Sequence, residues 1–373
     1  MGKHLALIGG GHAHMMILDN LKTIVDKGIK VTVIAPSSHH YYSGMGPGML
    51  GGRYSPDDIR FATEDVVTKQ GGTFICDRVV KMDPKAKEIF TEAGKTVGYD
   101  VACCNAGSYI PMDTVPGQLE NIYPVKPIEK LWDAAQTLKM LFREKRISVS
   151  IVGGGPSSAE VAGNVLELAQ RTNGFTPEIR IFARSGLMSG FPESVRSRVF
   201  SILKKKGVLI HEQAPVKAVG PGSIQLASGQ SYTTDFIFMA TGVRPSTIFE
   251  DSGLPVGPDK GLLVNRFLQS VAYPEIFGGG DCICFQETPL TKVGVYAVRQ
   301  NPVLLNNVVA ALEEKPLMPF DPGPEYLLIF NLGGCTGVLK KKGLVFGGKL
   351  AFMIKDYIDR RFIKQFQAIE KNL

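Results

Sequence analysis

The feature that most constrains this fold is an apolar strand followed by a glycine turn and a helical pattern, which occurs twice. The first copy places its turn glycines at Gly9 and Gly11. The second copy places them at Gly153 and Gly155. Glycine permits the tight turn and lets the backbone approach a pyrophosphate, which is held by the free N–H groups at the helix start. Two copies in order predict two Rossmann-like dinucleotide-binding units in an α/β fold.

Length and composition narrow the class of protein. The 373 residues are too many for one ordinary core, so at least two domains are expected. No apolar run reaches the roughly 20 residues that span a bilayer, and no signal peptide is recognisable. Six cysteines show neither disulfide density nor metal-ligand spacing, so we expect a cytoplasmic protein without a metal site.

The second strand of each unit lacks the usual acid. In such units a carboxylate near the end of this strand holds the ribose hydroxyls. The strand over 30–35 is followed instead by Ser37, the nearest group able to bond a ribose. The strand over 178–185 ends in Arg184 and Ser185, which suit a 2′-phosphate, so either NADH or NADPH fits. A merely solvated Arg184 is the alternative.

Other small-residue stretches accompany the glycine turns. Residues 39–52 predict a glycine-rich loop that folds against a flat ligand, unless it is an ordinary surface loop. A strand over 73–80 is expected to end near an adenine. The stretch over 98–111 and the stretch over 235–245 each close one unit with a small-residue turn. A late Gly280-Asp281 suits a ribityl hydroxyl and a phosphate.

The ordered set resembles the two-dinucleotide-binding-domain flavoproteins over about residues 3–310. The finer resemblance is to type II NADH dehydrogenases, sulfide:quinone reductases and the flavoprotein module fused to selenophosphate synthetase. It rests on the segments 9–14, 41–45, 292–300 and 356–362. The resemblance implies FAD in the first unit and NAD(P)H in an inserted second unit.

The resemblance also implies domain limits and site residues. The FAD-binding domain would comprise 1–113 and 245–318, the NAD(P)H-binding domain 114–244, and a C-terminal region 319–373. Residues expected to hold the cofactors are Gly9, Gly11, His12, Ala13, Ser37, Gly44, Val80, Ala106, Gly107, Gly280, Asp281 and Val295 for FAD, and Gly153, Gly155, Glu160, Arg184 and Gly242 for NAD(P)H. Residues expected at the reacting groups are Pro47 near the flavin ring, Lys292 near its pyrimidine end and Gln300 on the acceptor side.

The implied function is an FAD enzyme that passes electrons from NAD(P)H to a quinone or similar acceptor. Two alternatives stay open. Sulfide oxidation would need cysteines beside the flavin, and the available cysteine spacing does not clearly match. A redox-sensing accessory module would bind the same cofactors with little turnover. The first helix lacks a Cys-x4-Cys pair, so no dithiol mechanism is expected.

The C-terminal tail carries most of the positive charge. From position 339 on there are nine Lys or Arg residues against three Asp or Glu, and the net charge of the whole chain is +7. The rest is near neutral, so no nucleic-acid partner is expected. Apolar residues recur at helical spacing over 349–373, at Leu350, Ile354, Ile358, Phe362, Phe366, Ile369 and Leu373. This pattern predicts a helix in the membrane interface, on the inner face of the membrane, or one packed on the protein or a homodimer partner.

Overall fold

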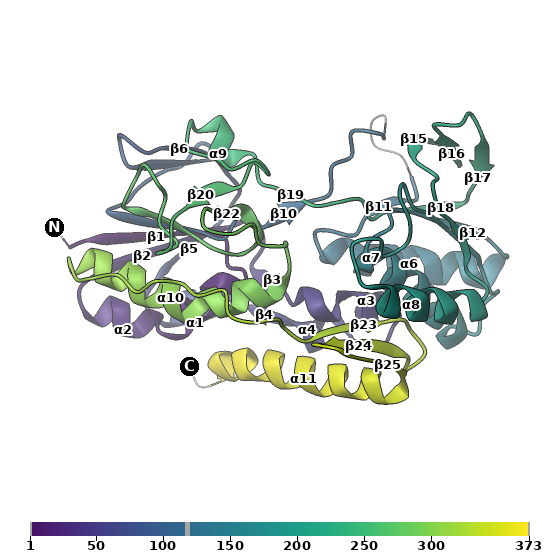
Figure 1. The fold of residues 1–373 in the computed structure, drawn as a ribbon. Helices are drawn as coiled ribbons and strands as arrows, with labels where there is room; N and C mark the ends of the chain where they lie inside the picture. Colours follow the sequence, from purple (N-terminus) through teal and green to yellow (C-terminus); the bar gives the residue numbers. More distant parts are fainter. Residues whose placement is uncertain (1, 116–119, 372–373) are drawn as a thin grey trace.

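Two parallel sheets of five strands form the two halves of the molecule (Figure 1). The computed structural model describes residues 2–115 and 120–371. The first sheet has the order β21 (Ile276–Gly278), β9 (Val101–Cys104), β1 (His4–Ile8), β2 (Lys30–Ala35), β5 (Thr73–Cys76). The second has the order β11 (Ile122–Pro124), β18 (Phe236–Met239), β12 (Ser148–Val152), β13 (Glu178–Phe182), β14 (Leu209–His211). The predicted α/β class with two Rossmann-like units is confirmed.

Each glycine turn follows the central strand of its sheet. β1 pairs with β9 on one side and β2 on the other, and β12 lies in the same way between β18 and β13. Both central strands are almost completely buried, as expected where helices cover both faces of a parallel sheet. Connections leave a central strand in opposite directions, which opens a crevice at its carboxyl end.

Helices cover the two sheets, and short antiparallel sheets extend them. The first half contains η1 (His12–His14), α1 (Met15–Asp19), α2 (Leu21–Asp26), α5 (Thr63–Lys69), α9 (Ile248–Asp251), η3 (Gly280–Cys282) and α10 (Gly294–Leu312). The second half contains α6 (Glu129–Glu144), α7 (Pro156–Arg171) and α8 (Glu193–Lys205). The small sheets are β6 (Val79–Asp83) with β7 (Glu88–Thr91) and β8 (Thr96–Gly98), β15 (Val216–Gly220) with β16 (Ser223–Leu226) and β17 (Ser231–Thr233), and β20 (Leu262–Val264) with β22 (Ile283–Phe285).

The second half is inserted into the first through two adjacent segments. β10 (Ser108–Tyr109) leaves the first half, β19 (Arg244–Pro245) returns to it, and the two strands pair antiparallel. The outgoing and returning chains therefore cross between the halves side by side (Figure 1).

Two local expectations are wrong. The strand expected over 73–80 is divided between β5 and β6, which belong to different sheets. The loop expected over 39–52 contains β3 (His39–Tyr41), paired with β4 (Arg60–Ala62), then η2 (Ser43–Met45) and α3 (Gly46–Leu50). α3 is completely buried because it packs against α6 and α7 of the other half, and a short α4 (Pro56–Ile59) follows it.

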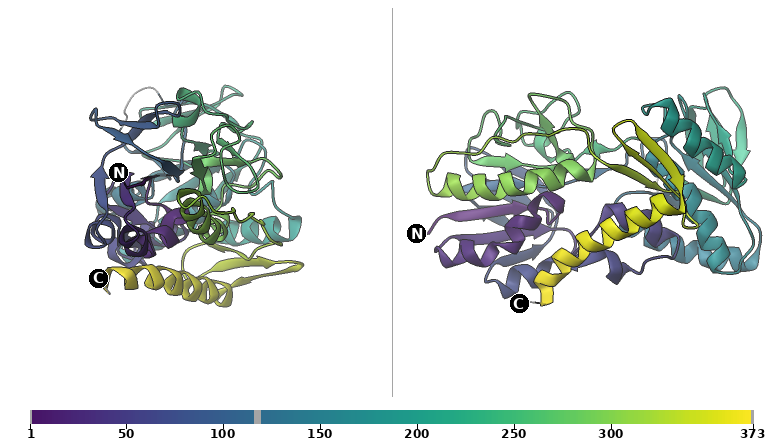
Figure 2. Two further views of the ribbon diagram at one scale, coloured as in Figure 1. Left: turned by 90° about the vertical axis from the view of Figure 1, so that its left-hand side faces the viewer. Right: turned by 60° about the horizontal axis from the view of Figure 1, so that its bottom comes forward.

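The C-terminal region joins both halves from below. β23 (Leu328–Asn331), β24 (Gly337–Lys341) and β25 (Leu344–Gly348) form a small sheet beside the second half, and α11 (Lys349–Lys371) runs back beneath the first (Figure 1). Figure 2 shows α11 passing diagonally across both halves. It packs on β23, β24 and β25 near its start and on β4 and α5 farther along.

The expected apolar stripe of the tail is mostly an inner face. Phe362 and Phe366 pack on the protein, and Phe366 is buried. The outward face instead exposes Leu350, Met353 and Tyr357, together with Ile358. Leu373 of the expected stripe lies outside the described residues. Within residues 2–115 and 120–371, no helix combines the length and apolar character needed to span a bilayer.

Candidate functional site

The first glycine turn is built so tightly that only glycine fits. Gly9 has φ +89°, and a Cβ there would lie 2.3 Å from the carbonyl oxygen of Asn105. Its N–H donates to the carbonyl of Ile34 at 2.8 Å, which ties the turn to β2. A Cβ on Gly11 would lie 2.8 Å from the amide nitrogen of Asn105. The turn following β9 therefore lies directly against the turn following β1.

Unpartnered polar atoms mark this turn as a binding site. His12 Nε2 and Asn105 Nδ2 are buried and have no hydrogen-bond partner among the described residues. Buried polar atoms are usually paired, so a ligand is expected to satisfy them. His12 Nδ1 lies 3.0 Å from His40 Nε2, and burial lowers the pKa of His12 to about 4, so this imidazole is neutral. The Asn105 amide donates, and His12 Nε2 donates in the tautomer whose Nδ1 accepts from His40. With the close backbone, these groups fit the pyrophosphate half of FAD.

Asp281 lies beside the same turn and is paired across the two halves. Its carboxylate accepts hydrogen bonds from Lys126 Nζ at 2.6 Å and from the Ser108 hydroxyl at 2.9 Å. Burial would raise the pKa of Asp281, but Lys126 and Ser108 outweigh it and hold the pKa below its usual range. The site thus has an ionised carboxylate where a ribityl hydroxyl is expected. No sequence motif indicated Lys126, because it belongs to the inserted half.

Lys292 and Gln300 support this turn from α10 and the segment before it. Gln300 is buried, and its Oε1 accepts the N–H of Gly280 at 2.7 Å. Lys292 Nζ donates to the carbonyl of Ile283 and lies 2.7 Å from the Asp259 carboxylate. Both side chains are thus already engaged in shaping the turn. Their expected roles at the reacting groups stay predictions.

The second glycine turn repeats the construction. Gly153 has φ +141°, and a Cβ there would lie 2.1 Å from the carbonyl of Ala240. Ser158 Oγ and Thr241 Oγ1 are buried without a partner among the described residues. A cavity of about 210 Å³ adjoins the turn and is lined by Gly155 and Arg184 among others. This arrangement fits the nucleotide half of NAD(P)H.

Glu160 does not line that cavity. It lies one turn into α7, and its carboxylate accepts the N–H of Asn331 at 2.8 Å, so it faces the C-terminal region. Its expected part in shaping the nicotinamide nucleotide site stays a prediction. Burial raises the pKa of Glu160 to about 7, although the nearby Lys355 opposes this. Glycine-turn spacing alone could not show which face of α7 meets the tail.

A polar row on α11 meets the segment after β3. Lys355 Nζ donates to the carbonyl of Gly44 at 2.8 Å and to the Asp359 carboxylate at 2.7 Å. The Tyr42 hydroxyl donates to the same carboxylate at 3.1 Å. The spacing of Lys355 and Asp359 by four residues puts both on one helix face. With Glu160, they form a charged cluster between the halves that the sequence reading missed.

The remaining expected residues are distributed around these turns. Ala13 is buried in η1, and Ala106 and Gly107 follow β9. Ser37 follows β2, and its hydroxyl accepts the N–H of His39. Val80 is exposed on β6, Val295 lies in the first turn of α10, and Pro47 is enclosed in α3. Gly242 is exposed beyond β18. Several of them thus lie at or next to the two glycine turns, and the cofactor contacts expected of the others stay predictions.

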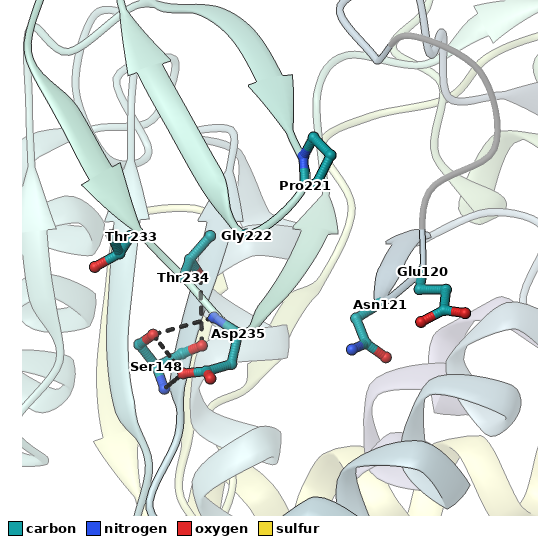
Figure 3. Close-up of a pocket in the computed structure, with 8 residues that line it drawn as sticks. All are labelled: Glu120, Asn121, Ser148, Pro221, Gly222, Thr233, Thr234 and Asp235. Carbon is teal, nitrogen blue, oxygen red and sulfur yellow. Dashed lines mark hydrogen bonds between the residues drawn. The ribbon is translucent and has the colours of Figure 1, made fainter.

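A larger cavity, of about 700 Å³, lies away from both turns. It is lined by Ser148, the first residue of β12, and by Asp235, which precedes β18, so it lies at the amino ends of these strands (Figure 3). The Ser148 N–H and hydroxyl both donate to the Asp235 carboxylate at 2.9 Å. Ligands of open α/β sheets bind at the carboxyl ends. We therefore do not assign this cavity to the cofactors.

Similar proteins are known from sequence and structure. A type II NADH:quinone oxidoreductase of Staphylococcus saprophyticus is 25% identical, over 98% of this chain and 96% of the relative. The sulfide:quinone oxidoreductase of Aquifex aeolicus superposes with a TM-score of 0.78 at 18% identity, over 99% of this chain and 92% of that one. An engineered water-forming NADPH oxidase superposes with a TM-score of 0.73 at 20% identity, over 90% and 74%.

The family model described as pyridine nucleotide-disulphide oxidoreductase matches residues 3–309, which include both glycine turns, Asp281 and Gln300. The resemblance stated from the sequence is thereby confirmed. With two ligand-fitting turns at the carboxyl ends of two parallel sheets, this chain belongs to the pyridine nucleotide-disulphide oxidoreductase family.

Proposed function

We propose that this protein is an FAD-dependent oxidoreductase that passes electrons from NAD(P)H to a quinone or similar acceptor. The observation that carries the proposal is the pair of glycine turns, each closed against a neighbouring carbonyl and each flanked by unpartnered buried polar atoms. Two dinucleotides are thereby accommodated in one chain. When bound, FAD supplies a ring system that accepts a hydride and releases electrons.

The chain's own residues orient and stabilise the bound cofactors and do not themselves react. The turn at Gly9 and the ionised Asp281 would fix FAD in the first half. The turn at Gly153 and the cavity beside Arg184 would fix the donor in the second. The link between Lys126 and Asp281 holds the two halves together beside the site. Positioning of this kind is the protein's main contribution in cofactor enzymes.

A group that holds a proton near neutral pH lies between the halves. Glu160, with its pKa raised to about 7, adjoins Lys355 and the Gly44 segment. Reduction of a quinone to a quinol takes up two protons as well as two electrons. Glu160 and Lys355 are the groups of this cluster that we propose to supply or relay protons to the acceptor.

We further propose that the acceptor is met at a membrane surface. The outward face of α11 exposes Leu350 (61%), Met353 (55%) and Tyr357 (65%), and Leu344 (60%) is exposed at the start of the preceding strand β25. Lys341, Lys342, Lys349, Arg361 and Lys364 are basic residues of the same region. An apolar face bordered by basic side chains suits the interface of an anionic bilayer. Such a location suits a lipid-dissolved quinone.

The relatives include both possible donors, NADH and NADPH, and the residues after β13 bear on the choice between them. The Staphylococcus relative is an NADH enzyme, whereas the engineered oxidase binds NADPH. In that oxidase three consecutive replacements, of Asp by Ala, Ala by Arg and Met by Ser, produce the sequence Ala-Arg-Ser. The same three residues occur here at 183–185, directly after β13.

The test is anaerobic reduction of the purified protein. Reconstitution with FAD should give a yellow protein that is bleached by NAD(P)H and recoloured by a soluble quinone. A protein that binds no FAD, or whose flavin is not bleached by either nucleotide, would contradict the proposal. Bleaching without recolouring by any quinone would instead support the accessory-module alternative.

Sulfide oxidation is the second candidate, because a structural neighbour is a sulfide:quinone oxidoreductase. The three buried cysteines argue against it. Cys103 and Cys104 are buried in β9, and burial raises the pKa of both thiols well above the usual range. Cys282 is also buried, and its pKa is raised to about 11. Thiols of this kind are poor nucleophiles at neutral pH. Flavin bleaching by sulfide that is lost in Cys282→Ala would reverse this judgement.

A further inference from the structure

We infer that the electron donor is NADPH in preference to NADH, and that Arg184 and Ser185 hold its 2′-phosphate. The inference deepens the proposed function and rests on the second glycine turn being the donor site. It is carried by three features of this chain: the fixed backbone at the end of β13, the loop closed over the glycine turn, and the charge of the cavity.

The backbone that presents Arg184 and Ser185 is held on both sides. The N–H of Ala183 donates to the carbonyl of His211 at 2.9 Å, and the N–H of Ala214 donates to the carbonyl of Ala183 at 3.0 Å. The Gln213 side chain donates to the carbonyl of Ser185. Ala183 is buried, whereas the side chains of Arg184 and Ser185 are exposed. A rigid backbone thus directs two free polar side chains to the cavity mouth.

The loop after these residues closes over the glycine turn. The N–H of Met188 donates to the carbonyl of Gly154 at 2.6 Å. Arg196 and Glu212 fix this loop at Leu187. Arg196 Nε donates to the carbonyl of Leu187, and the Glu212 carboxylate accepts the N–H of Leu187. Arg184 and Ser185 are therefore fixed beside Gly155, at the edge where the adenosine ribose of a dinucleotide lies.

The charge of the cavity favours a phosphate over a hydroxyl. Among the described residues that line it, Arg184 is charged and none is acidic. Glu212, which follows β14 and lies near Gly186 of the cavity lining, has its carboxylate 2.8 Å from Arg196 and also accepts the Leu187 N–H, so its charge is paired within the protein. An NADH site uses a carboxylate to accept the ribose hydroxyls. Here such a carboxylate is replaced by a guanidinium and a hydroxyl, both of which donate to phosphate.

The direct test compares two fragments of the donors. Calorimetric titration of the FAD-loaded protein should show 2′,5′-ADP binding at least about tenfold more tightly than 5′-AMP, because one contains the added phosphate and the other does not. Equal affinities, or tighter binding of 5′-AMP, would overturn the inference. This result does not depend on turnover, so it stands even if the proposed electron transfer fails.

Flavin bleaching separates the two proposals. Stopped-flow reduction should be at least about tenfold more efficient with NADPH than with NADH at subsaturating concentrations. Bleaching by both at equal efficiency would leave the proposed function standing and overturn the donor preference. Tight 2′,5′-ADP binding without bleaching by NADPH would leave the 2′-phosphate site standing and overturn the proposed electron transfer.

Variants identify the residues. Arg184→Ala should weaken 2′,5′-ADP binding about tenfold or more and leave 5′-AMP binding within about twofold. Ser185→Ala should have a smaller effect of the same kind. Lys205→Ala removes an exposed cation of α8 in the same half, and it should change neither the affinity for 2′,5′-ADP nor the affinity for 5′-AMP. An equal loss in Lys205→Ala and Arg184→Ala would show that general charge, rather than a built subsite, attracts the phosphate. An Arg184→Ala protein with unchanged 2′,5′-ADP affinity would refute the assignment.

Discussion

The Nζ atom of Lys126 lies 2.6 Å from the carboxylate of Asp281 and joins the two halves of the molecule. Lys126 follows β11 of the inserted half, whereas Asp281 belongs to η3 of the first half. Both side chains are largely buried, with 25% and 15% exposed. The ion pair therefore binds one dinucleotide unit to the other beside the first glycine turn.

Asp281→Asn should weaken this link. We expect a loss of about 2 kcal/mol in the free energy of unfolding at pH 7, since hydrogen bonds to charged groups contribute about 1.5–3 kcal/mol. The pKa of Asp281 is lowered in the folded protein, so its stabilisation is present above the unfolded pKa of about 3.9 and is lost as the pH falls below that value. Urea unfolding at pH 7 and pH 3.5 should show the deficit of the variant shrinking in acid.

A surface ion pair provides the matched control. Asp113 and Arg244 also face each other at the crossing between the halves, at 3.0 Å, but are 68% and 58% exposed. Asp113→Asn should cost less than about 1 kcal/mol. Equal losses in the two variants would mean that Asp281 has no special place in joining the halves.

Alanine substitutions at the two glycine turns should impair the binding of FAD and of NAD(P)H separately. Gly9→Ala and Gly153→Ala each put a Cβ about 2 Å from a backbone carbonyl at a positive φ, so each local turn must move. Gly9→Ala should yield protein that retains little FAD. Gly153→Ala should stay yellow but lose most of its bleaching by nucleotide.

Absorbance of the purified proteins and anaerobic titration measure both outcomes. Gly343→Ala is the control, because a Cβ there would meet no atom within 4 Å. A colourless Gly153→Ala protein together with a yellow Gly9→Ala protein would reverse the assignment of the two halves.

Glu160 should make stability depend on pH in the opposite sense to Asp281. Its pKa is raised to about 7 in the folded protein, mainly by burial, and is about 4.3 when unfolded. Between these values the unfolded chain loses a proton that the folded protein keeps, so stability falls as the pH rises from about 4.5 to 7. Glu160→Gln removes this effect.

The difference in free energy of unfolding between Glu160→Gln and the unchanged protein measures it. We expect that difference to shift in favour of the variant by on the order of 2 kcal/mol between pH 5 and pH 7.5. The comparison cancels the opposite contributions of the buried histidines, whose pKa values are lowered. A difference that stays constant over this range would refute a proton held by Glu160.

The outward face of α11 should bind anionic lipid. Replacement of Leu350, Met353 and Tyr357 by Gln should abolish most cosedimentation with vesicles of phosphatidylglycerol, because these side chains are the exposed apolar surface of the helix. Bleaching by NAD(P)H in solution should be unchanged. Met140→Gln and Phe175→Gln alter exposed apolar side chains elsewhere and should still cosediment. A change from dimer to monomer without loss of lipid binding would assign this face to a second copy of the chain.

The local parts of the site could be predicted from the sequence. Gly9 and Gly153 were identified because a strand, a glycine turn and a helix are consecutive in the chain, and their constraints are local. The missing acids after β2 and β13 could be read in the same way. The limits of β2 and β12 agree with the apolar runs, since buried parallel strands need such runs.

The tertiary structure decided which faces meet. The contact of Glu160 on α7 with Asn331 of the C-terminal region had no signal in the sequence. The sequence left lipid, the protein itself or a second copy open as the partner of Phe362 and Phe366, and in the structure they pack inward, as α11 does on β4 and α5. An amphipathic pattern shows that a helix has an apolar face, but it does not show what covers that face.

By itself, the sequence determined an α/β chain with two phosphate-binding turns, because spacing and backbone freedom at a few glycines suffice for that. Only the tertiary structure brought Lys126 to Asp281 and Lys355 to Gly44, across 155 and 311 residues of chain. Such pairs depend on how two separately folded halves and a returning helix pack together. That packing is decided by the sum of many buried contacts, which no single stretch of sequence contains.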